Sequence, residues 1–287
     1  MTTNLPVIPA DVPTHDNTMM TAAMKCLRLY KERYRNHWTS KERAVPLSFG
    51  ALMHLGLNVW YKTKDPDKAL MALVDANYVD PPGDHRTRGL AITILAESIE
   101  WYGDERRWWG DDVILNETAI NIEDEDGFRW GGRLDLLVRY KGSLWVVDHK
   151  TTSIGTDRWW DEYLLSPQMG GYVYSAGVIA GAPIAGVIIN RIIIPKNKLP
   201  PEKQFKRRPF LWDANKLAEW RRQMIHNYHQ IYQAIETGDF PPNWYACIGR
   251  YGRCSRYGIC TLPANSRERA NRADFTQEPW DWNEVNE

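Results

Sequence analysis

The clearest pattern of apolar and polar positions lies between residues 131 and 150. Apolar and polar residues alternate along two runs, Arg133–Tyr140 and Ser143–Lys150, and Lys141 and Gly142 separate the runs. Alternation with a period of two is typical of a half-buried strand, and a two-residue break containing glycine is typical of a tight turn. The pattern therefore predicts a β-hairpin.

The register of this hairpin predicts where its charged side chains lie. If the two separating residues form the loop, counting back along both strands places Asp135 opposite Asp148. Opposed residues, and residues two apart on one strand, share a face of the sheet. We therefore expect Asp135, Asp148 and Lys150 on one face, and the side chain of His149 on the other with the apolar residues.

Helical periodicity and capping residues predict several helices around this hairpin. Two further apolar runs, 113–122 and 184–195, read as strands, and the second is dense in Ile and Val, as a buried strand should be. Together these elements predict an α/β fold with a mixed sheet flanked by helices. The predicted helices cover residues 17–35, 48–61, 85–101, 157–165 and 213–235, and two more begin at Asp65-Pro66 and at Ser166-Pro167.

The same pattern predicts how the chain is organised into segments. We expect one domain over residues 17–262, preceded by an extended arm over 1–16. Within that domain the expected segments are a helical insertion over 62–110, a catalytic core over 111–195, an irregular proline-containing loop over 196–208 and a cysteine segment over 243–262. Residues 263–287 form a polar tail, expected to be partly disordered or docked by its tryptophans.

Two facing carboxylates in an apolar hairpin need a compensating cation, because like charges opposite each other destabilise a strand pair. A divalent metal is the simplest candidate, since Mg²⁺ and related ions bind one or two carboxylates and keep several waters. Lys150 could then orient or deprotonate a water, or balance charge on a phosphate. The alternative is that Lys150 and Arg133 simply neutralise Asp135 and Asp148, and the hairpin alone does not decide between the two. Glu117, in the first predicted strand, reads equally well as an extra carboxylate near the metal or as a solvated charge.

Composition limits the possible functions only weakly. The 287 residues are 43% hydrophobic and 25% charged, which is ordinary for a globular protein with one large domain. The formal net charge is zero, which is mild evidence against strong nonspecific affinity for nucleic acid. The sequence contains no apolar stretch long enough to span a membrane and no apolar signal-peptide core, so the cytoplasm is the expected location.

The chain has four cysteines, Cys26, Cys247, Cys254 and Cys260, and the last three crowd into one glycine-rich segment. In a protein expected in the cytosol this arrangement suggests a metal site rather than disulfides. Four thiolates suit zinc or an iron–sulfur cluster, and the paired C-x2–4-C spacing usual for zinc is absent. Four independent thiols are the plainer alternative.

Several motifs occur in the order found in one enzyme family. They are Gly-Arg-Leu-Asp135, Asp148-His-Lys-Thr-Thr, Gln168-Met-Gly-Gly-Tyr172 and, on an earlier helix, Gly50-Ala-Leu-Met-His54. Together they resemble the core of the PD-(D/E)xK nuclease superfamily, and most closely its RecB-like branch. That branch includes the AddB nuclease domain and the CRISPR-associated RecB-like exonucleases. The resemblance runs from Cys26 to Cys260.

The resemblance implies a restriction-endonuclease-like fold and a role for each matching residue. Mg²⁺ or Mn²⁺ would be bound by His54, Asp135, Asp148 and the backbone carbonyl of His149. Lys150 would orient or activate the attacking water. Gln168 and Tyr172 would support the substrate phosphate.

The four cysteines resemble the iron–sulfur staple of the same relatives, in which a 4Fe–4S cluster joins the N- and C-terminal parts of the chain. The sequence departs from their common form because six residues separate Cys247 from Cys254, where many relatives have two. This departure puts the local loop geometry in doubt more than the identity of the ligands. Zinc remains the alternative cofactor.

The implied function is metal-dependent hydrolysis of DNA, expected to proceed from DNA ends in recombination or repair. The chain has no G-x-x-x-x-G-K-[ST] phosphate loop, so a helicase or another repair protein is an expected partner. The alternative is a DNA-binding or assembly subunit with little activity of its own. The expected contacts to DNA phosphates are the basic residues Lys206, Arg207, Arg208, Arg250 and Arg253.

Overall fold

The computed structural model describes residues 14–41, 44–103, 108–110, 112–124, 127–249 and 252–281. These residues group into two compact units. The sheet unit comprises residues 44–120 and 133–220, and the terminal unit comprises the described parts of 1–43, 121–132 and 221–284. The segment boundaries expected from the sequence stay a prediction.

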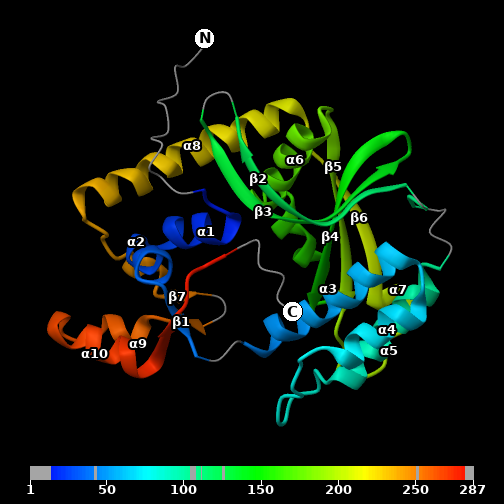
Figure 1. Ribbon diagram of the computed structural model, residues 1–287, viewed down its shortest axis with the longest axis horizontal. Helices are drawn as coiled ribbons and strands as arrows, with labels where there is room; N and C mark the ends of the chain where they lie inside the picture. The colour runs from blue at the N-terminus through cyan, green and yellow to red at the C-terminus, as the bar shows by residue number, and fades with distance from the viewer. Residues whose placement is uncertain are drawn as a thin grey trace. The chain divides into compact units, whose positions relative to one another are not determined.

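The sheet has five strands in the order β2-β3-β4-β5-β6 (Figure 1). β3 and β4 are antiparallel, β4 and β5 are parallel, and β5 and β6 are antiparallel, so the sheet is mixed as the sequence predicted. The strands are β2 (Val113–Glu123), β3 (Arg129–Tyr140), β4 (Ser143–Thr152), β5 (Ile184–Ile193) and β6 (Phe205–Leu211).

The predicted hairpin is confirmed in type and register. Tyr140 pairs with Ser143 and Leu136 pairs with Val147. Lys141 has φ 49° and the following glycine has φ 79°, the two positive values that a type I′ turn requires. This turn matches the right-handed twist of the strands, so the register is set locally.

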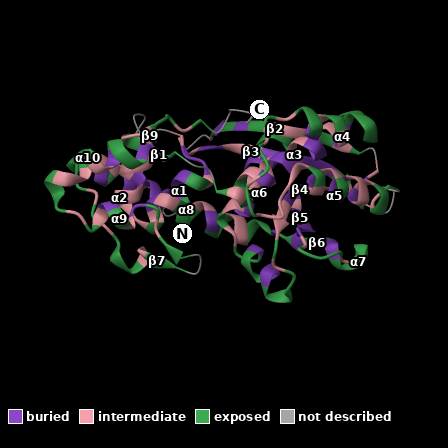
Figure 2. Cartoon of the chain, turned by 90° about the horizontal axis from the view of Figure 1, so that it is seen from below, coloured by how far each residue is buried: buried purple, intermediate pink, exposed green. Residues whose placement is uncertain are grey.

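Helices pack on the sheet of the sheet unit. α3 (Val45–Thr63) covers the face that carries Leu136 and Val147 of the hairpin, and α6 (Pro167–Ala180) packs on β4 and β5. Buried residues run along β3 and along the inner side of α3, as Figure 2 shows in purple. The other helices of this unit are α4 (Pro66–Asp75), α5 (Arg88–Trp101), η3 (Asp157–Tyr163), α7 (Pro201–Gln204) and the first turns of α8 (Ala214–Thr237).

The terminal unit holds short elements from both ends of the chain. A two-stranded sheet pairs β1 (Trp38–Ser40) with β9 (Phe275–Gln277), and Trp280 donates from its indole nitrogen to Asp16, 3.0 Å away. The tail is therefore structured up to residue 281, and Trp282 lies outside the described residues. The remaining elements are α1 (Asn17–Lys25), α2 (Leu27–Tyr30), η1 (Lys31–Arg35), η4 (Trp244–Ala246), β7 (Ile248–Gly249), β8 (Gly252–Arg253), α9 (Tyr257–Cys260) and α10 (Ala264–Asp274).

Some predicted elements were wrong in their bounds. The helix predicted over 17–35 is capped by Asp16 and is broken at Cys26, which has extended backbone angles (φ −169°, ψ 115°). The helix predicted from Ser48 begins at Val45, because Pro46 in its first turn needs no amide partner. The helix predicted from His85 begins three residues later, after a Thr87 cap.

The larger error concerns residues 196–208, which were predicted as an irregular loop. The segment contains α7, and its end enters β6, which pairs antiparallel with β5. β6 is an edge strand, where proline is tolerated because one side of the strand makes no ladder hydrogen bonds. Pro209 therefore did not exclude a strand.

No helix in the described part of the chain is both long and apolar enough to cross a bilayer.

Gly170→Ala should destabilise the protein by about 1–3 kcal/mol, although alanine normally favours a helix. A Cβ at this position of α6 would lie 2.3 Å from the ring of Trp220, which is too close for any real contact. Gly177→Ala in the same helix is the matched control, since the nearest atom to its Cβ would be 3.6 Å away. Urea unfolding of both variants measures the difference. Equal stabilities would show that the packing of Trp220 on α6 is not tight.

Candidate active site

Three potential metal ligands from three different elements meet at one point of the sheet unit. His54 comes from α3, Glu117 from β2 and Asp135 from β3, and their ligand atoms all lie within 4.8 Å of one another. This is the one such group of three or more among the His, Cys, Asp and Glu residues that the structure describes. The predicted residues His54 and Asp135 are thus brought together, although 81 positions separate them in sequence.

His54 is held with each ring nitrogen on a different partner. Its Nε2 donates to the backbone oxygen of His149 at 3.0 Å. Its Nδ1 lies 3.5 Å from Glu117 Oε1 and 3.6 Å from Asp135 Oδ1. Burial by itself lowers the pKa of His54, but Asp135 and Glu117 outweigh it and raise the pKa to about 9. Without a metal, His54 therefore carries the positive charge that balances these carboxylates.

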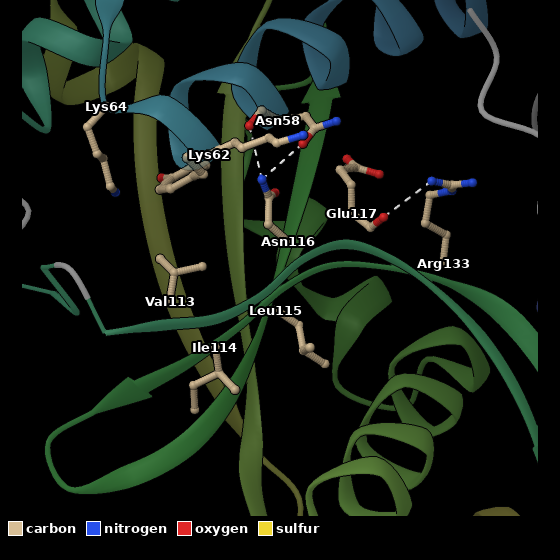
Figure 3. A pocket seen from close by; sticks show the side chains of 10 residues that line it. Asn58, Lys62, Lys64, Val113, Ile114, Leu115, Asn116, Glu117 and Arg133 are labelled. Carbon is tan, nitrogen blue, oxygen red and sulfur yellow. Dashed lines mark hydrogen bonds between the residues drawn. The ribbon is translucent and has the colours of Figure 1, made fainter.

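Glu117 is the site residue that the sequence left open. Its backbone has φ 43°, a left-handed conformation that costs a residue with a side chain about 1–3 kcal/mol. Asn116 and Glu117, consecutive in a strand, consequently both point toward α3 (Figure 3). Strict alternation would have sent one of them to the other face, so the alternation alone could not decide between the two interpretations of Glu117.

Asp148 and Lys150 form the second half of the site. The Lys150 amine donates to Asp148 Oδ1 at 2.8 Å, while Asp148 is 1% exposed. Burial raises the pKa of Asp148 to about 6, with Lys150 opposing that rise and Asp135 adding to it. The pKa of Lys150 lies above its usual value, because Asp148 and Asp135 outweigh its burial. The lysine is therefore a cation at neutral pH.

These residues fit a divalent cation. Asp148 Oδ2 is buried and has no hydrogen-bond partner, which costs free energy unless something else binds it. Carboxylate oxygens and one imidazole nitrogen suit Mg²⁺ or Mn²⁺. The imidazole would bind through Nδ1, with Nε2–H fixed by the His149 carbonyl, the usual way in which a metal-bound histidine is oriented.

Comparison with known proteins agrees with this geometry. The family model of the PD-(D/E)XK nuclease superfamily matches residues 18–261. The chain belongs to this superfamily. No protein with a curated function matches the chain.

Comparison with solved structures finds one that shares the fold at low sequence identity, and others that align with lower scores. The crystal structure of a presumed exonuclease from Eubacterium rectale aligns with TM-score 0.57 and 14% identity, over 92% of this chain and 94% of that one. SSO0001 aligns with TM-score 0.33 and 13% identity, over 75% and 85% of the two chains. LHK-Exo, solved in complex with dAMP, aligns with TM-score 0.30 and 14% identity, over 66% and 93%.

Gln168 and Tyr172 of this superfamily member lie one turn apart on α6, as the sequence predicted. Gln168 Nε2 donates to the Tyr172 hydroxyl at 3.0 Å. The pKa of Tyr172 is well above its usual value because of burial and of the charges of Asp148 and Asp135. Tyr172 is therefore a neutral hydroxyl that faces the electrostatic field of the site.

The His149 side chain points away from the carboxylates, as the hairpin register predicted. Its ring stacks on Tyr61 of α3 at 5.5 Å, and its Nδ1 accepts from the Asn190 amide at 2.8 Å. Arg207 donates both to Asn190 Oδ1, at 3.4 Å, and to the Tyr61 hydroxyl, at 2.9 Å. The side chains of His149, Tyr61, Asn190 and Arg207 thus form a closed ring of contacts. This ring fixes the position of His149, which lies between Asp148 and Lys150 in the strand.

Asn190→Ala should lower the free energy of unfolding by about 1–3 kcal/mol, because it leaves His149 Nδ1 and one Arg207 donor without their partner. Asn190 is 0% exposed, so water cannot replace the lost bonds without entering the core. Asn197→Ala, at an exposed position, is the control. Denaturant unfolding gives both values; similar stabilities would mean that the ring contributes nothing net.

Four of the five basic residues predicted to contact DNA lie in the described part of the chain. Lys206 and Arg208 are exposed on β6, whereas Arg207 is half-buried in the ring above, with Tyr102 and Trp109 against its guanidinium at 3.6 and 4.3 Å. The guanidinium of Arg207 therefore contacts protein groups on several sides and is not exposed to solvent as a free charge. Arg253 is exposed on β8, with its guanidinium over Tyr257, and Arg250 lies outside the described residues.

The cysteines of the terminal unit are all half-buried free thiols. The backbone amide of Asn243 donates to Cys26 Sγ at 3.3 Å. The Cys247 thiol donates to the backbone carbonyl of Asn243 at 3.8 Å. Desolvation and the neighbouring Cys254, Cys260 and Cys26 raise the pKa of the Cys247 thiol. Within the described residues, however, no three cysteine sulfurs come within 4.8 Å of one another.

Proposed function

We propose that this chain is a divalent-metal-dependent nuclease that hydrolyses DNA phosphodiester bonds, acting as an exonuclease on DNA ends. The observation that carries the proposal is the meeting of His54, Glu117 and Asp135 beside buried Asp148 and its half-buried ion-pair partner Lys150. Burying carboxylates costs free energy even when cations such as His54 and Lys150 lie beside them, and the position of Asp135 and Asp148 in the superfamily's motifs favours a catalytic reason for that cost.

The proposed roles follow from the charges of the residues. Bound Mg²⁺ or Mn²⁺ would polarise the scissile phosphate and acidify a water. Asp135, Asp148, Glu117 and His54 would hold it. Lys150, whose amine lies 2.8 Å from Asp148, would orient or activate the attacking water and would donate a hydrogen bond to the phosphate oxygens, where negative charge develops.

Gln168 and Tyr172 would act as hydrogen-bond donors to the phosphate. Tyr172 retains its proton for the reason given above, and Gln168 has a second amide hydrogen beyond the one given to Tyr172. The His149 carbonyl, predicted as a metal ligand, accepts from His54. In this arrangement it supports the imidazole, and a carbonyl oxygen has a second lone pair with which it would bind the metal.

The second part of the proposal is membership of the RecB-like branch, with a 4Fe–4S cluster on Cys26, Cys247, Cys254 and Cys260. A zinc ion would hold its sulfurs within about 4 Å of one another, given Zn–S bonds of about 2.3 Å in a tetrahedron. The sulfurs are not gathered that closely. A four-iron cluster spaces its thiolates more widely, because each binds a different iron. Iron and sulfide analysis after anaerobic purification tests this; zinc without iron would contradict it.

The biological setting is proposed from the same resemblance: DNA as substrate, recombination or repair as the process, and a helicase or other repair protein as partner. The catalytic proposal itself is tested with end-labelled linear DNA and closed circular DNA, each single- and double-stranded, with Mg²⁺ or Mn²⁺. Loss of linear DNA alone supports an exonuclease. Cutting of circles would make the enzyme an endonuclease. A folded protein that binds DNA and cuts neither form would favour the assembly subunit.

A further inference from the structure

A polar pocket of about 600 Å³ opens directly beside the candidate metal centre. It lies between the C-terminal half of α3 and the start of β2, and Glu117 belongs both to its wall and to the group of metal ligands (Figure 3). A nucleic-acid strand that is cleaved at the metal centre extends beyond the cleaved bond, so it must lie on a surface next to that centre. This pocket is such a surface, because the two sites share a side chain.

One face of α3 connects the pocket to the metal centre. His54, Asn58 and Lys62 are spaced four residues apart, so they follow one another along a single side of the helix. Asn58 accepts from the amide of Asn116 at 2.9 Å, which ties this side of α3 to β2. In Figure 3, Asn58 and Lys62 on α3 lie opposite Asn116 and Glu117 on β2.

The pocket carries positive charge that the described protein does not use. Lys62 is exposed and forms no ion pair or hydrogen bond with any residue in the part of the chain that the structure describes. Lys64 and Arg133 also line the pocket, although both already have partners. The one carboxylate in the wall is that of Glu117, at the end where the metal ligands lie.

We infer that this pocket binds the backbone phosphates of the substrate strand a few nucleotides from the cleaved bond, with Lys62 as the phosphate contact. This inference rests on the proposed function, which places the cleaved bond at the metal centre. Eight residues of helix separate His54 from Lys62, a rise of about 12 Å. A strand in a duplex advances about 3.4 Å per nucleotide along the axis, so Lys62 reaches a phosphate three or four nucleotides away.

The ligand class follows from the lining. An exposed ammonium such as that of Lys62, with two further cations in the same wall, suits a phosphodiester, which lysine binds as a point charge. Contacts to phosphate carry no sequence information directly, so the Lys62 contact should be independent of sequence. DNA and RNA share this phosphate chemistry, and comparing the two oligonucleotides in the same assay identifies which strand is bound.

The test measures binding without cleavage. A fluorescent single-stranded 12-mer is titrated with the full chain in Ca²⁺ or EDTA over a range of salt concentrations. The plot of log K against log salt falls with a slope of about −0.7 per phosphate contact for single strands, so each lost contact makes the plot less steep by about 0.7. Lys62→Ala should show that decrease and weaker binding at low salt, and Lys62→Arg should restore both. Lys198→Ala, an exposed lysine outside the pocket, should change neither.

The outcomes separate this inference from the proposed function. An unchanged slope in Lys62→Ala overturns the phosphate contact, even if wild type cleaves DNA. A reduced slope supports the contact, even if no metal supports cleavage. Absence of oligonucleotide binding by folded wild type overturns it as well. In an active enzyme, the Lys62→Ala defect should be present for the 12-mer and absent for a dinucleotide substrate, which cannot reach Lys62; equal defects on both would contradict the inference.

Discussion

Replacing Lys150 with alanine should lower the rate of DNA cleavage by at least about 10²–10³-fold, the usual effect of removing one donor that stabilises charge in a transition state. Lys150 is the cation nearest to the carboxylate of Asp148, which faces Asp135 in the hairpin, and its amine donates to Asp148 at 2.8 Å. The loss should appear in kcat rather than in KM, because the charge that the lysine stabilises develops during the reaction.

Two controls make the Lys150 result specific. Lys141→Ala changes an exposed lysine at the turn of the same hairpin and should leave cleavage unaltered. Lys150→Arg keeps the charge but not the geometry of a single ammonium, and should recover only part of the rate. Cleavage by Lys150→Ala at the wild-type rate would exclude this hairpin as the catalytic centre.

The hairpin could be predicted from sequence because its information is local. Alternation, a two-residue turn and facing charges all lie within 20 consecutive residues, and the turn alone sets the register. The helix that carries Gln168 and Tyr172 was predicted for the same reason, since Ser166 and Pro167 mark its start. Local rules of this kind predicted the type of these elements, although they misplaced the bounds of three other helices.

The rest depended on contacts between distant segments. β6 contains one proline and three charged residues, and only its pairing with β5 makes it a strand. Arg207 looked like a DNA contact because its neighbours are basic, but its partners come from three other segments of the chain: Tyr61, Asn190 and the aromatic residues near 102–109. Glu117 joins the site through a backbone conformation that tertiary packing imposes. No pattern of neighbouring residues encodes such contacts.

Asp148→Asn should abolish metal-dependent cleavage and at the same time stabilise the metal-free protein. The buried carboxylate has a pKa of about 6, compared with 3.8 when exposed. A carboxyl group whose folded pKa is raised contributes stability below the unfolded value, and that stability is lost as the pH rises through the folded value. At neutral pH the ionised Asp148 thus costs up to about 3 kcal/mol, at 1.36 kcal/mol per pKa unit.

The asparagine keeps an oxygen for Lys150 and removes the buried charge, so the variant should melt at a higher temperature than wild type in EDTA at pH 7.5. The difference should shrink as the pH falls from about 6 to about 4, where the wild-type carboxyl becomes protonated in both states. Thermal melts of both proteins across this range measure it. A variant less stable than wild type at every pH would show that the Lys150–Asp148 ion pair outweighs the burial of the carboxylate.

Added metal should reverse the order of stability. A ligand that binds only the folded state stabilises it by about 2.7 kcal/mol at one hundred times its dissociation constant. Mg²⁺ or Mn²⁺ should therefore raise the melting temperature of wild type and have much less effect on Asp148→Asn, which lacks one ligand charge. The burial of this carboxylate then has a physical explanation: the free energy that Asp148 costs in the metal-free protein is recovered when the cation binds. If metal stabilised both proteins equally, Asp148 would not be a ligand, and the orphaned Oδ2 would need another explanation.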